Sequence, residues 1–527
     1  MLWAAGGLDR RNETGWKAAM SGKEGDAKAL RPADRLANAH NWKHLARWHG
    51  EGFYELKTED TGDCRVRLFF TPQLLDAAEE ILYRQIVNAT RFPGVRMVVI
   101  TPDAHYGYGV PVGCVLITDA QDGAVAMGPV GYDIGCGMMS ARSNVEAEAA
   151  TPERRLEFNR AVMGRVNMGF GGKSMKLGRL SEEEFQNLVR GGAEYYVEKY
   201  GATFDRSHAE RHRIPVDDDW QIPWGGKGRP ERGREQMGSL GGGNHFIELQ
   251  RSSQTGTLFV QVHTGSRGFG HGLATNYFEL AREEHPELLK DIDLGYFTPE
   301  SSHYRDYLNA VAAGGNYAIL NRLVIFEQVS EAFREVFGEN LELVYEISHN
   351  LVQKEWHPEF GDVWVHRKGA TRAFPAGHPF LKGTVWEETG HPVLIPGSNK
   401  DWSYILRPLA GAERSGFSVN HGAGRRISRG EANRTLSQRQ MDDEYREAGI
   451  LVNTDGRVPL DEAAPCYKPS EEVVAAVVGA GLAEIEHSLW PLASLKGVDE
   501  LKRGKRGRRG KGGGGNAKHG KKTSEHY

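Results

Sequence analysis

Residues 95–109 read VRMVVITPDAHYGYG, an apolar run followed directly by a polar loop rich in glycine. The run at 95–100 is typical of a buried β-strand. Loops that follow strands and carry polar groups on a rigid scaffold are typical of functional sites. Seven further short polar motifs also follow, or nearly follow, hydrophobic runs: VGYDIGCG (130–137), GSLGGGNHFIE (238–248), HTGSRGFGH (263–271), SHN (348–350), HRKGATRAFPAG (366–377), PGSNKDWSY (396–404) and HGAGRR (421–426).

The segments around these motifs predict short strands with helices between them. Strand-like runs are expected at 113–118, 128–134, 246–249 and 258–262. A cap followed by proline predicts two helix starts, one at Thr71–Pro72 that runs past Tyr83 and one at Thr151–Pro152. Further helices are expected at a capping box formed by Ser181 and Glu184, along about 303–337, and in a hairpin near 470–487.

Composition describes a folded protein with an unusual distribution of charge. The chain has 527 residues, 39% of them hydrophobic and 26% charged, which excludes a mostly disordered, collagenous or membrane-embedded chain. Residues 501–527 hold ten Lys or Arg and one acid, a local charge of +9, so the other residues carry −13. The four cysteines form no CxxC pair, which argues against a zinc ribbon or a disulfide framework. We expect a cytoplasmic protein that does not enter the membrane.

The loops contain residue types that bind transition metals. Asp133 and Cys136 lie three residues apart around a tight turn, and three loop histidines accompany them: His245, His263 and His349. A thiolate is a soft ligand, so ligand chemistry alone favours zinc. A bridging Cys136 would hold two ions about 3.5–4 Å apart, as in two-metal phosphoryl-transfer sites.

Arginines in the same loops suit phosphate binding, although surface exposure or pairing with a carboxylate explains any one of them equally well. They are Arg267, Arg372, Arg425 and Arg426. A nucleotide-binding P-loop is excluded. GGKS at 171–174 matches its end, but Asn167 stands where the first glycine is required.

Taken in order, the eight motifs resemble those of the RtcB family of RNA ligases, and Tyr467 and LKG at 495–497 fit its C-terminal part. The resemblance covers roughly residues 60–500. It implies an α+β fold with mixed β-sheets flanked by helices and a central metal and nucleotide cleft. It also implies a ligase that uses GTP and two Mn²⁺ ions to join RNA 2′,3′-cyclic phosphate or 3′-phosphate ends to 5′-hydroxyl ends in RNA splicing or repair. The resemblance also suggests an archease-type activator as a partner.

The same resemblance implies roles for individual residues. His421 would be the nucleophile that becomes guanylylated, and Cys136 would bridge two ions, one completed by Asp133 and His245 and the other by His263 and His349. Positions that match GTP contacts are Asp103, Asn244, Phe246, Glu248, Ser398, Ser403, Tyr467 and Lys496. Positions that match phosphate or RNA contacts are Arg267, Arg372 and Arg425.

The sequence also departs from the family. A methionine–glycine pair usually follows PGS, whereas this chain has Asn399, Lys400, Asp401 and Trp402, so GTP affinity or nucleotide choice is expected to differ. These differences indicate a divergent paralogue. We expect a poorly ordered extension at 1–40, a catalytic domain at 41–500 with a polar surface insertion at about 204–236, and a disordered basic tail at 501–527.

Two other hypotheses stay open on the sequence. The first is a metal-dependent RNA cyclic phosphodiesterase or phosphatase that has lost guanylylation. The second is a non-catalytic protein that binds RNA through its basic tail, which would add salt-sensitive affinity that does not depend on sequence. A cluster of a thiol and histidines argues against the second, because simple binding does not need one.

Overall fold

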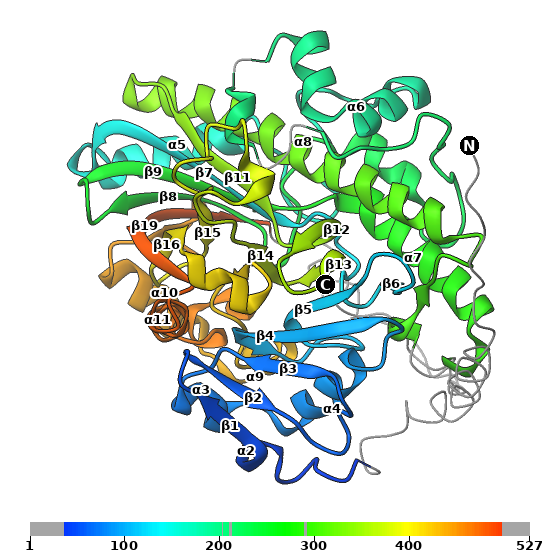
Figure 1. Cartoon of the computed structure of the whole chain (residues 1–527). Coiled ribbons are helices and arrows are strands. Elements are labelled where there is room, and N and C mark those ends of the chain that lie inside the picture. The colour runs from blue at the N-terminus through cyan, green and yellow to red at the C-terminus, as the bar shows by residue number, and fades with distance from the viewer. Residues whose placement is uncertain (1–35, 203, 210–212, 289–291, 498–527) are drawn as a thin grey trace, which may run out of the picture.

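The computed structural model describes residues 36–202, 204–209, 213–288 and 292–497. Two large β-sheets occupy the middle of the molecule, with helices on their outer sides (Figure 1). The first sheet has the order β1 (Ala46–His49), β2 (Phe53–Leu56), β3 (Arg65–Leu68), β4 (Val95–His105), β5 (Val112–Asp119), β13 (Gly361–Lys368) and β12 (Asn350–His357). The second has the order β11 (Glu342–Ser348), β7 (Gly137–Glu146), β9 (Thr257–Thr264), β8 (Phe246–Ser252), β19 (Ala483–Lys496), β16 (Ser403–Pro408) and β15 (Val393–Ile395), with β18 (Leu451–Val452) beside β19.

Both sheets are mixed. Most neighbouring strands are antiparallel, but β3 pairs with β4 in parallel, and β18 pairs with β19 in parallel. Two small antiparallel pairs complete the strands: β6 (Val125–Ala126) with β10 (Tyr296–Phe297), and β14 (Ala370–Arg372) with β17 (Ser418–Asn420). The expected α+β architecture with mixed sheets flanked by helices is therefore confirmed.

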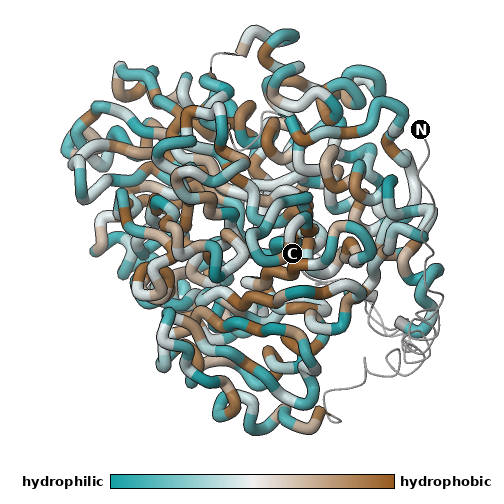
Figure 2. Tube along the Cα trace, in the orientation of Figure 1, coloured by the Kyte–Doolittle hydropathy of each residue, from teal (hydrophilic) through white to brown (hydrophobic). Residues whose placement is uncertain are grey.

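Strand β4 explains why the two sheets pack together. Because side chains alternate along a strand, Val98 and Ile100 face one core while Met97 and Val99 face another. The second of these cores also contains residues of β15, β16 and the β14–β17 pair, so it lies between the two sheets. Figure 2 shows hydrophobic segments along β4 and β5 in the middle of the molecule.

The helices cover the outer sides of this arrangement. Near the first sheet lie α2 (Trp42–Leu45), α3 (Pro72–Ala77) and α4 (Glu80–Ala89). The second sheet is covered by α5 (Pro152–Met163), α6 (Glu182–Tyr200), α7 (Arg267–Glu284) and α8 (Tyr304–Phe337). The C-terminal part adds α9 (Arg429–Thr435), α10 (Gln438–Glu447) and α11 (Ser470–Gly479). Helix α8 has 34 residues and packs against α5, α6 and α7.

Several local predictions are confirmed. Thr71, Thr151 and Ser181 each cap a helix by accepting a hydrogen bond from a backbone N–H three residues later. The strand-like runs at 95–100, 113–118, 246–249 and 258–262 all lie in strands. The long helix expected at 303–337 is α8.

Three local predictions are wrong. Residues 128–134 form turns instead of a strand, because the N–H groups of Val130 and Gly131 donate back to the carbonyl of Met127. The expected helical hairpin at 470–487 is α11 followed by β19, since Gly481 adopts a φ of +63° and ends the helical path. The helix expected to run from Thr71 past Tyr83 is two helices, because Ala78 and Glu79 are extended.

The segment at 204–236, expected to be a polar surface insertion, is partly buried. Its apolar side chains enter the core beneath α8: Ile214, Val216, Trp220 and Ile222. Asn316 of α8 accepts a hydrogen bond from the Ile214 N–H, which fixes this segment to the helix. Predictions about residues 1–35 and 501–527 lie outside the described residues. Within the described part of the chain, no helix is long and apolar enough to cross a membrane.

Candidate active site

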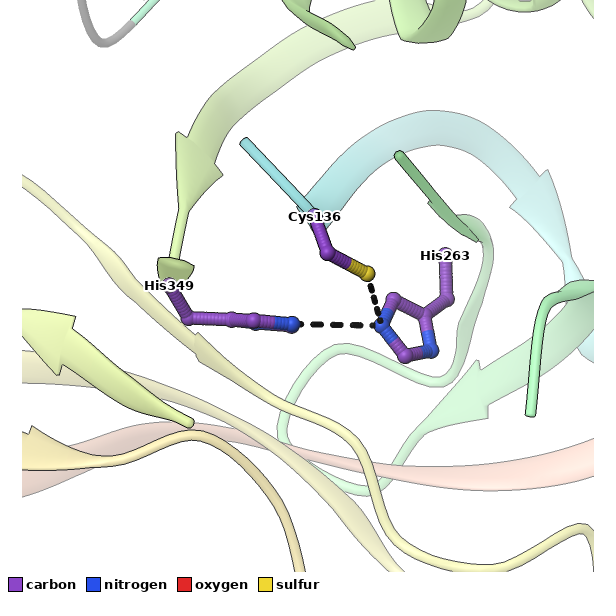
Figure 3. A group of neighbouring side chains, drawn as sticks. All are labelled: Cys136, His263 and His349. Atoms are coloured by element: carbon purple, nitrogen blue, oxygen red, sulfur yellow. Dashed lines mark hydrogen bonds between the residues drawn. The ribbon is translucent and has the colours of Figure 1, made fainter. Parts of the chain in front are cut away.

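Cys136, His263 and His349 converge where β7, β9 and β11 reach the space between the sheets (Figure 3). Cys136 Sγ lies 3.3 Å from His263 Nε2, which lies 3.4 Å from His349 Nε2. All three residues are buried. Their ligand atoms lie within 4.8 Å of one another, so they form one candidate metal site.

Asp133 and His245 form a second group with the same cysteine. His245 Nε2 lies 3.6 Å from Cys136 Sγ and 3.2 Å from Asp133 Oδ2. The ligand atoms of Asp133, Cys136 and His245 also lie within 4.8 Å of one another. The structure therefore brings all five predicted metal ligands together in two groups that share Cys136.

The histidines are oriented as metal ligands require. His245 Nδ1 donates to the carbonyl of Leu240 at 3.0 Å, and His263 Nδ1 donates to the carbonyl of Asn244 at 3.2 Å. A carbonyl only accepts, so Nδ1 carries a proton in both rings, and Nε2 is the nitrogen that faces the cluster and can bind a metal. Burial also lowers the pKa of His263 well below its usual value, which keeps that imidazole neutral.

The two acidic ligands differ in their protonation. Burial alone would raise the pKa of Asp133, but the hydrogen bond and charge of His245 lower it to about 2. Burial raises the pKa of the Cys136 thiol well above its usual range, and the nearby Asp133 adds to the shift. A bound cation would favour the thiolate, because metals displace the thiol proton. The carboxylate, thiol and three imidazoles fit two divalent cations with Cys136 between them.

Two adjacent residues of α8 hold the ligand loops in place. The buried Arg322 guanidinium donates to the carbonyls of Gly135 and Thr264 at 2.8 and 2.9 Å, and to Ser348 Oγ at 2.8 Å. Each partner is next in sequence to a predicted ligand. Asn321 donates to the carbonyls of Ser239 and Gly265, and its Oδ1 accepts from the Gly238 N–H at 2.7 Å. Sequence reasoning missed both residues because they lie in an ordinary helix far from the motifs.

Gly135 allows the Asp133–Cys136 turn to approach α8 closely. It adopts a φ of +75°, which favours glycine. A Cβ at this position would lie 2.7 Å from Ala318 Cβ and 3.0 Å from Gly315 Cα of α8. The glycine therefore serves both the backbone conformation and the contact that brings Cys136 to the cluster.

His421 lies beside the metal cluster and is held by Asp103. The His421 ring centre is 4.9 Å from that of His349. Asp103 Oδ2 accepts from His421 Nδ1 at 2.6 Å and from the backbone N–H groups of His421 and Gly422. Burial alone would raise the pKa of Asp103, but the charge and hydrogen bond of His421 lower it on balance. The carboxylate fixes a ring proton on Nδ1, so Nε2 is the ring nitrogen that could act as a nucleophile.

A second polar cluster lies at the same end of β8 as His245, where Lys496 at the end of β19 pairs with Phe246. Glu462 accepts from Tyr467, Arg429 and Arg425, and its carboxylate lies 3.8 Å from Lys496 Nζ. Lys496 Nζ also lies 5.3 Å from the centre of the Phe246 ring. Three of the predicted GTP contacts, Phe246, Tyr467 and Lys496, thus meet around Glu462. Sequence reasoning missed Glu462, which lies outside every motif.

Glu248, another predicted GTP contact, is buried and accepts from Gln250 at 2.7 Å. Burial raises its pKa from 4.5 to about 7. The folded protein therefore holds this proton to higher pH than the unfolded chain, so the stability linked to Glu248 is lost as pH rises from 4.5 through about 7.

The Glu248→Gln variant is expected to be more stable than the parent at pH 8 by up to about 3 kcal/mol and close to it at pH 4.5, because glutamine stays neutral. Urea unfolding at the two pH values measures this difference. Exposed Glu300→Gln is the control and should change neither value. An equal difference at both pH values would contradict the burial of an ionisable Glu248.

The remaining predicted nucleotide contacts border the same region. Ser403 Oγ accepts from the Gly397 N–H and from Gln250, and Ser398 lies in the same buried turn. Asn244 is exposed beside His245. The divergent residues are tied to α10: Asn399 Oδ1 accepts from the Tyr445 hydroxyl, and Lys400 pairs with Glu444 at 2.8 Å.

The three predicted phosphate-binding arginines have different surroundings. Arg267 adopts a φ of +53° and donates to Ser239 Oγ and to the carbonyls of Gly169 and Phe170. Arg425 is held by Glu462, Tyr467 and the Asp461 carbonyl. Arg372 contacts Gln353 and the Phe374 ring. Arg267 and Arg425 therefore lie at the metal and polar clusters, whereas these contacts of Arg372 are with β12 and the loop after β14.

Comparison with known proteins finds one family. A family model described as tRNA-splicing ligase RtcB matches residues 85–497. The tRNA-splicing ligase RtcB of Pyrobaculum aerophilum is 36% identical over 464 residues, which cover 82% of this chain and 94% of that protein. The corresponding protein of Thermococcus kodakarensis is 34% identical, with 82% and 94% covered. The RNA-splicing ligase RtcB of Mycobacterium bovis is 36% identical, and the match covers 78% of this chain and all of that protein.

Proposed function

Since this chain belongs to the RtcB family of RNA ligases, we propose that it uses GTP to join RNA 2′,3′-cyclic phosphate or 3′-phosphate ends to RNA 5′-hydroxyl ends. The observation that carries the proposal is the Asp103–His421 pair beside the shared-cysteine cluster. A hydrolytic metal site needs no nucleophilic histidine whose proton is fixed by a buried carboxylate. This pair therefore favours group transfer through His421.

His421 supplies the nucleophile in the proposed reaction. Its Nε2 attacks the α-phosphorus of GTP, an N–P bond forms, and pyrophosphate leaves as the P–O bond breaks. The ring proton stays on Nδ1, where Asp103 accepts it and stabilises the positive charge that develops. A 2′,3′-cyclic end is first opened by water to a 3′-phosphate, as the bond from phosphorus to the 2′-oxygen breaks and that oxygen takes up a proton. An oxygen of the RNA 3′-phosphate then displaces the histidine as the N–P bond breaks. The 5′-hydroxyl attacks the 3′-phosphorus of the resulting RNA-3′-pp-5′-G end, loses its proton to solvent and releases GMP.

Two Mn²⁺ ions would be held by Cys136 together with Asp133 and His245 on one side and His263 and His349 on the other. When bound, they would neutralise phosphate charge and orient the reacting groups. Arg322 and Asn321 position the ligands through the neighbouring backbone.

The buried polar cluster is the proposed guanine site. Glu248 would accept from the base, Lys496 and Tyr467 would line the pocket, and Phe246 would pack against the ring. Ser398, Ser403 and Asn244 would contact the rest of the nucleotide. Asn399 and Lys400 join this pocket to α10, which supports an altered affinity for GTP or another nucleotide in this chain.

The proposal is tested by incubating the full chain with α-labelled GTP and Mn²⁺, with and without an archease-type activator, and then adding RNA with the two matching ends. We expect an acid-labile protein–GMP adduct, followed by joined RNA. Absence of an adduct under all metals and with the activator would contradict the proposal. Opening of cyclic phosphate without GTP would then favour the hydrolytic alternative.

Asp103→Asn is expected to slow adduct formation by about 10²–10⁴-fold. The amide oxygen takes the place of Oδ2 and accepts from the same three N–H groups, but it carries no charge and therefore stabilises less the positive charge that develops on the attacking ring. Single-turnover adduct formation measures the rate, and metal content should stay unchanged because Asp103 is outside both ligand groups. Exposed Asp63→Asn is the control. A rate within twofold of the parent would show that the charge of Asp103 does not contribute to the attack.

A further inference from the structure

A cavity of about 320 Å³ lies beside the residues that follow His421; it shares Arg425 with the polar cluster and contains none of the predicted metal ligands. Its walls come from the end of α3, the end of β4, the residues after His421 and the start of α11. The lining includes Ala77, Ala78, His105, Arg426, Lys468 and Pro469. This volume is at the lower end for small-ligand sites, which suits one nucleotide.

The cavity is close to the proposed nucleophile. The His105 ring, which lines it, has its centre 6.5 Å from that of His421 and lies nearly parallel to it. Lys468 donates from its backbone N–H to the Gly424 carbonyl at 2.9 Å. An RNA strand whose end reacts at His421 would therefore pass close to this cavity.

The charges of the cavity leave one cation available. Arg425 is held by Glu462, and Lys468 Nζ donates to the carbonyls of Pro102 and Ala104. Arg426 is exposed, and its guanidinium has no hydrogen-bond or ion-pair partner among the described residues. Two carboxylates, Glu79 and Glu472, also line the cavity, and Glu79 accepts from the Tyr106 N–H. Arg426 is thus the group suited to a phosphodiester.

His105 offers the cavity a hydrogen-bond acceptor. Its Nδ1 donates to the Asp103 carbonyl at 3.0 Å, so Nε2 carries a lone pair. Burial lowers the pKa of His105 to about 3, which keeps the ring neutral at pH 7. A neutral acceptor suits a ribose 2′-hydroxyl, the group that distinguishes RNA from DNA.

We propose that this cavity binds one ribonucleotide of the phosphate-bearing RNA strand, a few nucleotides from the reacting end. Arg426 contacts a backbone phosphate, His105 Nε2 accepts from a 2′-hydroxyl, and the base rests on the apolar wall formed by Ala77, Ala78 and Pro469. The inference rests on the proposed RNA ligase function, because it concerns the substrate of the same reaction.

Filling the cavity tests the inference in the full-length protein. Ala77 is exposed at the end of α3, so Ala77→Trp is tolerated by the fold and occupies the opening. We expect the KM for the phosphate-bearing strand to rise about tenfold with guanylylation within twofold of the parent. Asp76→Trp, one residue earlier and outside the lining, is the matched control and should behave as the parent. Unchanged RNA joining in Ala77→Trp, or loss of guanylylation, would overturn the inference.

Charge and sugar recognition are measured separately. Arg426→Ala should raise the KM about tenfold and reduce the slope of log KM against log salt by about one. Single 2′-deoxy substitutions are placed in turn at the second to fourth nucleotides from the 3′ end. At one of these positions the substitution should raise the KM of the parent about fivefold. The His105→Phe variant should have the same KM for ribose and deoxyribose at that position. An effect confined to the 5′-hydroxyl strand would contradict the strand assignment. Failure of the parent to form an adduct would instead refute the proposed function, so the two outcomes are distinct.

Discussion

His421→Ala is expected to abolish the protein–GMP adduct and to lower RNA joining by at least about 10⁴-fold. Alanine offers no nitrogen that could form an N–P bond. Neither of the two neighbouring side chains, Asp103 and His349, can replace it. Asp103 accepts from Nδ1 on the opposite side of the ring, and His349 Nε2 is directed at the metal cluster. The measurement is retention of labelled GMP on the denatured protein together with gel analysis of joined RNA.

The fold should survive this change, because His421 is a partly exposed loop residue and the backbone N–H groups of residues 421 and 422 still donate to Asp103. Metal content should also be unchanged. His49→Ala, at an exposed histidine of β1, is the control and should ligate as the parent. An adduct of normal amount in His421→Ala would place the nucleophile elsewhere. Retention of cyclic-phosphate opening alone would be consistent with metal-dependent hydrolysis that does not require His421.

Cys136→Ala is expected to remove both bound metal ions and all RNA joining. Its thiol is the only atom common to the two ligand groups, so one substitution leaves two incomplete pairs of ligands. Loss of one strong ligand typically weakens a metal site by at least about a hundredfold. His349→Ala affects only one group and should leave about one ion per chain. Metal analysis after dialysis against Mn²⁺ gives the stoichiometry directly.

The control for this experiment is Cys64→Ala, at a half-buried cysteine in the loop before β3. It should keep two ions and full activity. Circular dichroism establishes that the Cys136 variant is folded, which is expected because alanine fits the space of the buried thiol. Two ions per chain in Cys136→Ala would show that the cysteine does not bridge. One ion in Cys136→Ala would show that only one group depends on it.

The ligand set was predictable because each of its members lies in a short motif that follows an apolar run. Asp133, Cys136, His245, His263 and His349 are 216 positions apart at most, yet strand ends of a sheet bring them within contact distance. Helix caps such as Thr151 were predictable for a similar reason, since the hydrogen bond joins residues three apart.

The parts that were not predictable depend on contacts between distant residues. Nothing local to α8 distinguishes Arg322 from a surface arginine, although its partners lie in the turn at Gly135 and at the ends of β9 and β11. Arg425 matched a phosphate-binding position, yet its pairing with Glu462 depends on how the segment before α11 folds back. Residues 483–487 were assigned to a helix because the pairing of β19 with β8 and β16 is not visible in a local pattern.

The anchoring of the ligand loops by Asn321 and Arg322 has a consequence for local unfolding. Loops normally open before the core does, and their amide protons exchange early with solvent. Here the turn at Gly135, the segment at Ser239 and the ends of β9 and β11 share partners in the largely buried helix α8. They are expected to exchange only when α8 itself is released, at a free energy close to that of global unfolding. The metal-free protein would then present its ligands already ordered, and the rate of ion uptake would be set by how fast an ion reaches the buried cluster.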